Sequence, residues 1–207
     1  MDNFVRDPRN GGIDDIFKSI NVFISLALEV TKLVGKILTE LVKALGIINP
    51  DENATDLGDK AIQAEAQGIV PEKYDNYQEY LNAVQNFELD PEKSKEIPEK
   101  DKLSKGVELI ALGVYDKFKD IDMLALAILM ATVFPPVILT GPAMSTLGAL
   151  IAKNPALVSA LIGYLSGSSK NGEELKLAQD TIVEILKVNN PNLKEEELIK
   201  QAAAYRK

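Results

Sequence analysis

The stretch MLALAILMATVFPPVILTGPAMSTLGALIA, residues 123–152, contains no charged side chain and decides how the rest of the chain is interpreted. After Lys153, residues 154–169 are again uncharged. A proline removes a backbone donor and clashes with the preceding helical turn, and prolines interrupt the two runs at positions 135, 136, 142 and 155. The pattern therefore predicts three short helices, at about 121–134, 143–153 and 155–165.

Two interpretations of this apolar region remain open. In the first, which we favour, it forms the buried core of a helical bundle, because its segments are short. In the second, residues 121–165 form a hairpin that enters a membrane, although a spanning helix needs about 20 apolar residues and Lys153 is expensive near the middle of the second arm. The side chains that form either the core or the membrane hairpin are Leu124, Leu126, Leu129, Phe134, Pro135, Pro136, Leu147, Leu150 and Leu161.

A long amphipathic helix is predicted upstream, over residues 13–48. Apolar residues recur there at spacings of three and four, which is the helical period, and Gly46 followed by Asn49 and Pro50 ends the pattern. The apolar stripe is wide, so this helix needs several neighbours, a partner chain or lipid. It is therefore either an assembly interface or a core helix, and its interface candidates are Phe17, Ile20, Phe23, Ile24, Val34, Ile37 and Leu41.

The negative charge is concentrated in residues 49–105, where fourteen acidic residues and seven lysines leave a net charge of −7. A short helix is predicted at about 57–67 and another from Pro71. Residues 87–105 hold two prolines and eleven charges, which predicts a solvated linker or an extended strap. Tyr74 and Tyr77 are further interface candidates, since tyrosine is enriched at protein contacts. Alternatively, they cover the core while Tyr80 is solvated.

The remaining segments also predict helices. One at about 103–119 places Val107, Ile110, Val114 and Tyr115 on one side, and a two-helix hairpin, at about 172–188 and from 195 onward, follows the apolar region. No sustained strand pattern is present. The sequence thus predicts an all-α helical bundle in four parts: a flexible arm (1–12), the long amphipathic helix (13–48), an acidic short-helix and linker segment (49–105) and a hydrophobic helical domain (106–207).

The composition excludes several kinds of function. The 207 residues include no Cys, no His and no Trp, which removes disulfides, thiolate or imidazole metal sites, Cys nucleophiles and histidine bases. A net charge of −8 argues against nucleic acid as a partner. The acidic cluster around Asp51 does not match a calcium loop, because Asp56 and Ile62 stand where glycine and glutamate are needed. We expect no metal, no cofactor and no catalytic residue.

These observations predict a non-enzymatic structural protein that works by assembly, through contacts with itself or with a protein partner. A component of a virion or of a secretion assembly fits this description. The alternative is a membrane-inserting protein, such as a pore former, a holin-like factor or a delivered effector, that uses the 121–165 hairpin. The first twelve residues lack the features of a secretory signal, so we expect the protein in the cytoplasm, or in a particle assembled there, with membrane association under the alternative.

Overall fold

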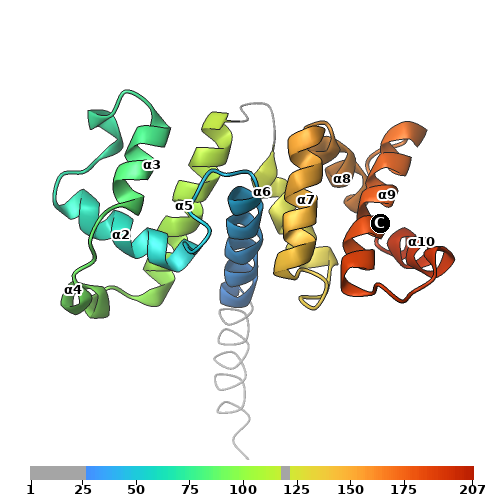
Figure 1. The fold of residues 1–207 in the computed structure, drawn as a ribbon, viewed down its shortest axis with the longest axis horizontal. Coiled ribbons are helices and arrows are strands. Elements are labelled where there is room, and N and C mark those ends of the chain that lie inside the picture. The colour runs from blue at the N-terminus through green and yellow to red at the C-terminus, as the bar shows by residue number, and fades with distance from the viewer. Residues whose placement is uncertain (1–26, 118–121) are drawn as a thin grey trace, which may run out of the picture.

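The computed structural model describes residues 27–117 and 122–207, which fold as an all-α helical bundle. Residues 27–44 form the central helix, which stands between two groups of helices (Figure 1). The N-terminal lobe contains α2 Ala54–Ala66, the 3₁₀ helix η1 Pro71–Lys73, α3 Tyr77–Gln85, α4 Pro91–Glu96 and α5 Glu99–Lys117. The C-terminal lobe contains α6 Met123–Val133, α7 Gly141–Lys153, α8 Leu157–Leu165, α9 Gly172–Asn189 and α10 Glu195–Ala204.

Local signals explain where these helices begin. A polar side chain before the first turn accepts a hydrogen bond from a backbone N–H that the helix leaves free. The residues that do so are Asn53, Asn76, Asp90, Asp122, Thr140 and Asn171. The three helices predicted in the apolar region are confirmed as α6, α7 and α8, each within two residues of its expected ends.

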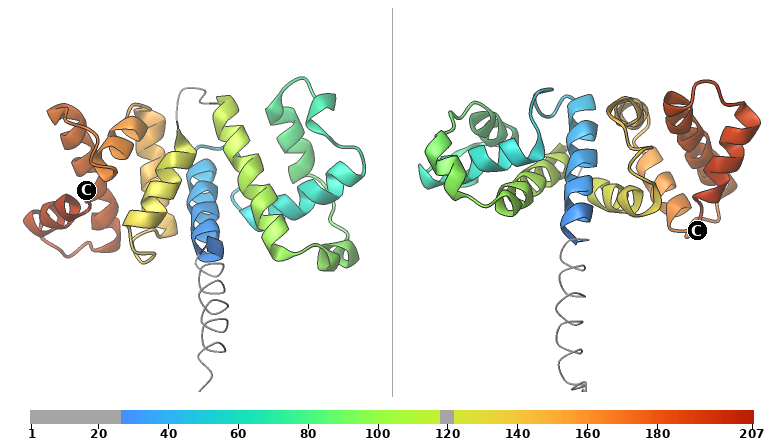
Figure 2. Two further views of the ribbon diagram at one scale, coloured as in Figure 1. Left: turned by 180° about the vertical axis from the view of Figure 1, so that it is seen from behind. Right: turned by 90° about the horizontal axis from the view of Figure 1, so that it is seen from below.

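The central helix packs against both lobes, which accounts for its wide apolar stripe. Figure 2 shows it between α5 and α6 in both views. On the side of the N-terminal lobe, a Cβ added to Gly35 would lie 3.0 Å from Cδ1 of Leu103 on α5. On the other side, a Cβ on Gly148 of α7 would overlap the side chain of Ala44. Within residues 27–44, the chain itself therefore supplies the neighbours that this apolar stripe needs.

This packing changes the interpretation of three interface candidates. Val34, Ile37 and Leu41 are 6%, 0% and 0% exposed. They therefore form part of the chain's own core and are not accessible to a partner. The sequence pattern shows that such a stripe must be covered, but it does not identify the covering surface. The other four candidates that the sequence predicted upstream lie outside the described residues: Phe17, Ile20, Phe23 and Ile24.

The uncharged region contributes most of the core of the C-terminal lobe. Its predicted core or hairpin side chains divide into buried Leu126, Phe134, Leu147 and Leu161, half-buried Leu129 and Leu150, and exposed Leu124, Pro135 and Pro136. Helices α6, α7 and α8 have 11, 13 and 9 residues, against the roughly 20 that a bilayer core requires. Within residues 27–117 and 122–207, no helix combines the length and the apolar character needed to cross a membrane.

The prediction of a linker over residues 87–105 is wrong. Helix α4 occupies Pro91–Glu96, and α5 begins at Glu99, so the expected boundary at residue 105 falls inside a helix. Both prolines precede or open a helix rather than interrupt one, which is compatible with their missing N–H group. The charges do not keep this segment apart from the core, because one of them, Lys102, is buried against a carboxylate.

Candidate functional site

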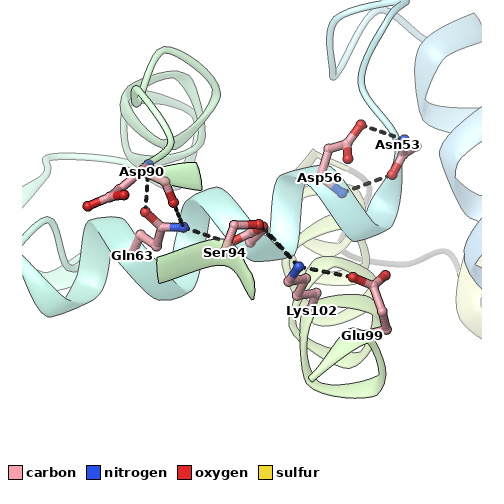
Figure 3. A network of polar contacts seen from close by, with 8 residues as sticks. Asn53, Asp56, Gln63, Asp90, Ser94, Glu99 and Lys102 are labelled. Carbon is pink, nitrogen blue, oxygen red and sulfur yellow. Dashed lines mark hydrogen bonds and ion pairs between the residues drawn. The ribbon is translucent and has the colours of Figure 1, made fainter. Parts of the chain in front are cut away.

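A buried ion pair joins α2 to α5. The Nζ atom of Lys102 lies 3.2 Å from Oδ2 of Asp59 and 3.0 Å from Oε1 of Glu99 (Figure 3). The side chains of Lys102 and Asp59 are only 8% and 6% exposed, whereas that of Glu99 is 78% exposed. The Asp59 contact is therefore the desolvated one, and the Glu99 contact resembles an ordinary surface pair.

The pKa shifts of this pair show that both groups hold their charge. Burial disfavours ionisation of Asp59, but hydrogen bonds from Ser94, Gln63 and Lys102, with the charge of Lys102, outweigh it and lower the pKa of Asp59. The hydrogen bond to Glu99 and the contacts with Asp59 raise the pKa of Lys102 against the effect of burial. A proton donor or acceptor needs a pKa near the working pH, and these shifts move both groups away from it. The pair is therefore suited to holding α2 and α5 together rather than to transferring protons.

The same network attaches α4 to the bundle. None of the six residues of α4 is buried, so polar contacts must hold it. The Ser94 hydroxyl donates to Asp59, and Lys102 Nζ donates to Ser94 Oγ at 3.2 Å. At the start of α4, Gln63 exchanges two bonds with the backbone of Asp90, one accepted at 2.9 Å and one donated at 3.3 Å (Figure 3).

Replacing Ser94 with alanine should loosen α4 without unfolding the bundle. The Ser94 hydroxyl makes two hydrogen bonds, to Asp59 and from Lys102, and the loss of each costs about 1 kcal/mol. Amide protection in residues 92–96 should therefore fall about thirty-fold in native-state hydrogen exchange, while protection in α9 stays unchanged. Ser104→Ala is the matched control, because Ser104 is an exposed serine on α5. Equal protection of α4 in the two variants would show that this network does not hold the helix.

Three tyrosines form an aromatic cluster in the N-terminal lobe: Tyr74, Tyr77 and Tyr80. The Tyr77 and Tyr80 ring centroids are 5.6 Å apart, and those of Tyr74 and Tyr80 are 5.9 Å apart. Tyr80 is 1% exposed and donates to Glu65 Oε1 at 2.8 Å, so the expectation that it is solvated is wrong. Tyr74 and Tyr77 are half-buried, and the Tyr77 hydroxyl donates to the carbonyl of Leu109 at 3.0 Å. Two of the interface candidates thus belong to an internal aromatic cluster.

Exposed apolar side chains concentrate in the middle of the chain. Of seven large ones in the described part, five fall between residues 112 and 137, and one of these, Val137, lies after the end of α6. The other four, on α5 and α6, are called here the apolar surface: Leu112, Tyr115, Leu124 and Ile128. Residues three or four apart share a helix face, so the first two lie together on α5 and the next two together on α6. These helices flank the central helix on opposite sides (Figure 2).

Only Leu124 of the apolar surface was among the predicted site residues. Tyr115 was expected on the inner side of its helix, but it is 62% exposed because α5 turns Ile110, Gly113 and Val114 inward. Residues 112 and 128 carry no signal in the sequence that separates them from core leucine and isoleucine. Their exposure depends on which side of each helix meets its neighbours.

The described residues hold no group of three or more acidic side chains placed to bind a metal ion. No family model, curated protein or solved structure matches this chain. The surfaces of the molecule itself are therefore the observations from which a function can be inferred.

Proposed function

We propose that this chain is a non-enzymatic helical protein that works by self-assembly, with the apolar surface on α5 and α6 as its contact. The observation that carries the proposal is the exposure of Tyr115, Leu112, Ile128 and Leu124 at 62%, 44%, 44% and 40% on the two helices beside the central helix. Large apolar and aromatic side chains dominate the energetics of protein contacts. Scattered single residues need no explanation, but these occur as pairs on one face of each helix.

The distribution of charge supports contact between copies of the same chain. A net charge of −8 repels like molecules, yet −7 of it belongs to residues 49–105, and residues 123–152 carry none. An interface centred on α6 therefore brings uncharged helix surface together, and the carboxylates nearest to it in the described part of the chain are Asp116 on α5 and Asp122 before α6. Such a contact between identical surfaces closes most simply as a two-fold dimer.

Sedimentation equilibrium of the full chain tests the proposal. We expect a mass about twice the 22.6 kDa of one chain, and Ile128→Glu should return it to that of a monomer with an unchanged helical spectrum, because the glutamate would be desolvated in the contact. Val188→Glu, at a 38% exposed residue of α9 away from the apolar surface, is the control and should leave the mass unchanged. A monomeric wild type across the accessible concentrations would overturn the proposal.

A further inference from the structure

A second surface, on the C-terminal lobe, has a different chemistry. Helix α9 packs against both α7 and α10, and the three helices border a cleft of about 460 Å³. Its apolar lining consists of Leu150 from α7, Leu177 and Val183 from α9, and Ile199 from α10. Ile199 is 43% exposed, and Leu150 and Leu177 are half-buried, so this lining is open to solvent. The volume falls within the range of ordinary binding pockets.

Carboxylates surround this apolar lining. Asp180, Glu184 and Glu195 line the cleft, and no lysine or arginine does. All three are exposed, and within the described part of the chain none takes part in an ion pair or a side-chain hydrogen bond. Asp180 and Glu184 are four residues apart on α9, a spacing at which like charges repel and destabilise a helix by a few tenths of a kcal/mol. A cation placed between them relieves that repulsion.

We propose that this cleft binds a short amphipathic helix of another protein, whose aliphatic side chains enter the cleft and whose flanking lysines or arginines face the carboxylates. A helix in a groove presents residues at spacings of three, four and seven, which suits a lining drawn from three helices. The proposal extends the proposed function from self-assembly to a partner of defined chemistry, and it does not depend on the apolar surface of α5 and α6.

The central helix of the chain itself does not match this chemistry. It carries Lys32 and Lys36 on its exposed side, but the apolar residues beside them, Val34, Ile37 and Leu38, are buried between the lobes. A helix whose apolar face is already covered has nothing to place against Ile199. The described part of this helix, residues 27–44, is for this reason excluded as the occupant.

The probe is a synthetic 15-residue helical peptide with leucines at spacings of three and four and lysines at the other positions, compared with a version in which glutamates replace the lysines. We expect the lysine peptide to shift the amide resonances of the labelled full chain in α7, α9 and α10, and the glutamate peptide to leave them unchanged. Added salt should weaken the binding, because exposed charges are screened.

Two matched pairs of variants locate the contact. Ile199→Glu should weaken lysine-peptide binding at least ten-fold, whereas Val188→Glu, at a similarly exposed apolar residue of α9, should change it less than two-fold. Glu195→Lys should weaken binding several-fold, whereas Glu196→Lys, in the same first turn of α10 but outside the lining of the cleft, should not. Within each pair the two substitutions are chemically alike, so a general loss of stability would affect both members.

Three results would overturn this inference. They are equal binding of the two peptides, shifts outside α7, α9 and α10, and a fall in the chain's own mass on Ile199→Glu, which would make a second copy the occupant. If the cleft does not bind the peptide, the proposal of self-assembly through Ile128 is unaffected. That proposal is tested by the masses of the wild type and of Ile128→Glu, which are measured without any peptide. Conversely, a monomeric wild type that binds the lysine peptide supports the cleft and removes only the proposed self-assembly.

Discussion

Gly106→Ala should lower the free energy of unfolding by about 3 kcal/mol, at the upper end of the usual cost of overpacking. A Cβ at this position of α5 would overlap the backbone carbonyl of Ala54, and a Cβ on Gly58 of α2 would overlap the carbonyl of Lys102. The two glycines thus face each other's helix, and a backbone cannot move aside as a flexible side chain can. Alanine improves helix propensity by about 1 kcal/mol over glycine, which is too little to offset separating the helices.

Gly113→Ala, in the same helix, is the control for this prediction. A Cβ there would lie 3.4 Å from Cδ2 of Leu81, which is ordinary contact, so we expect unchanged or slightly higher stability. Urea denaturation followed by circular dichroism measures both variants. Equal stability of Gly106→Ala and Gly113→Ala would show that α2 and α5 do not cross as closely as described.

Lys102→Met should lower the free energy of unfolding by about 3–5 kcal/mol, the usual cost of removing one partner from a buried ion pair. Asp59 would then keep its charge in a buried site with only the Ser94 hydroxyl and the Gln63 amide as donors. Asp59→Asn should cost less, because Lys102 retains the exposed Glu99 at 3.0 Å. The double variant, which buries no unpaired charge, should recover a large part of the loss, and a strictly additive double variant would argue against the pair.

The cost of Lys102→Met should depend on pH in a defined direction. In the wild type, the lowered pKa of Asp59 contributes stability that is present above the unfolded-state pKa of about 4 and is lost as the pH falls through the folded-state value. Without Lys102, Asp59 loses one hydrogen bond and its positive partner, so its pKa is higher than in the wild type and its protonation at low pH removes the unpaired buried charge. Urea denaturation of both proteins should show their difference largest near pH 7 and smaller near pH 3. A difference independent of pH would mean that the loss comes from packing.

The sequence predicted the beginnings and ends of α6, α7, α8 and α9 to within two residues, because those depend on local groups. It missed α4, and the helix expected from Pro71 is a 3₁₀ turn there, with α3 beginning at Tyr77. Pro142 is compatible with the first turn of α7, and Gly46 reaches a φ of 69° after the central helix, a conformation that glycine adopts without strain. Asn154 and Pro155 separate α7 from α8 by the same local rules. The fold class followed from these signals together with the helical spacing of apolar residues.

The failures share one cause, which is that a distant residue decides the outcome. Lys102 was counted among the charges of a solvated linker. It is buried instead, because it forms an ion pair with Asp59, which lies far earlier in the chain. Tyr80 was expected in solvent, but it is buried with its hydroxyl bonded to Glu65. Ion pairs and hydrogen bonds offset the cost of burying such groups. The sequence around Lys102 or Tyr80 does not show which distant residue will be its partner.

For this protein, amino-acid order alone determined that the chain is helical, where the helices of the apolar region stop, and that most of the apolar side chains in residues 123–152 must be shielded from water. Helix formation rests on bonds between neighbours four residues apart, so a short window of sequence contains the information. Only the tertiary structure decided that two lobes shield the central helix, that Asp59 and Lys102 meet, and that Ile128 and Ile199 stay exposed. Those outcomes depend on how helix surfaces fit one another across the whole chain, which no local window contains.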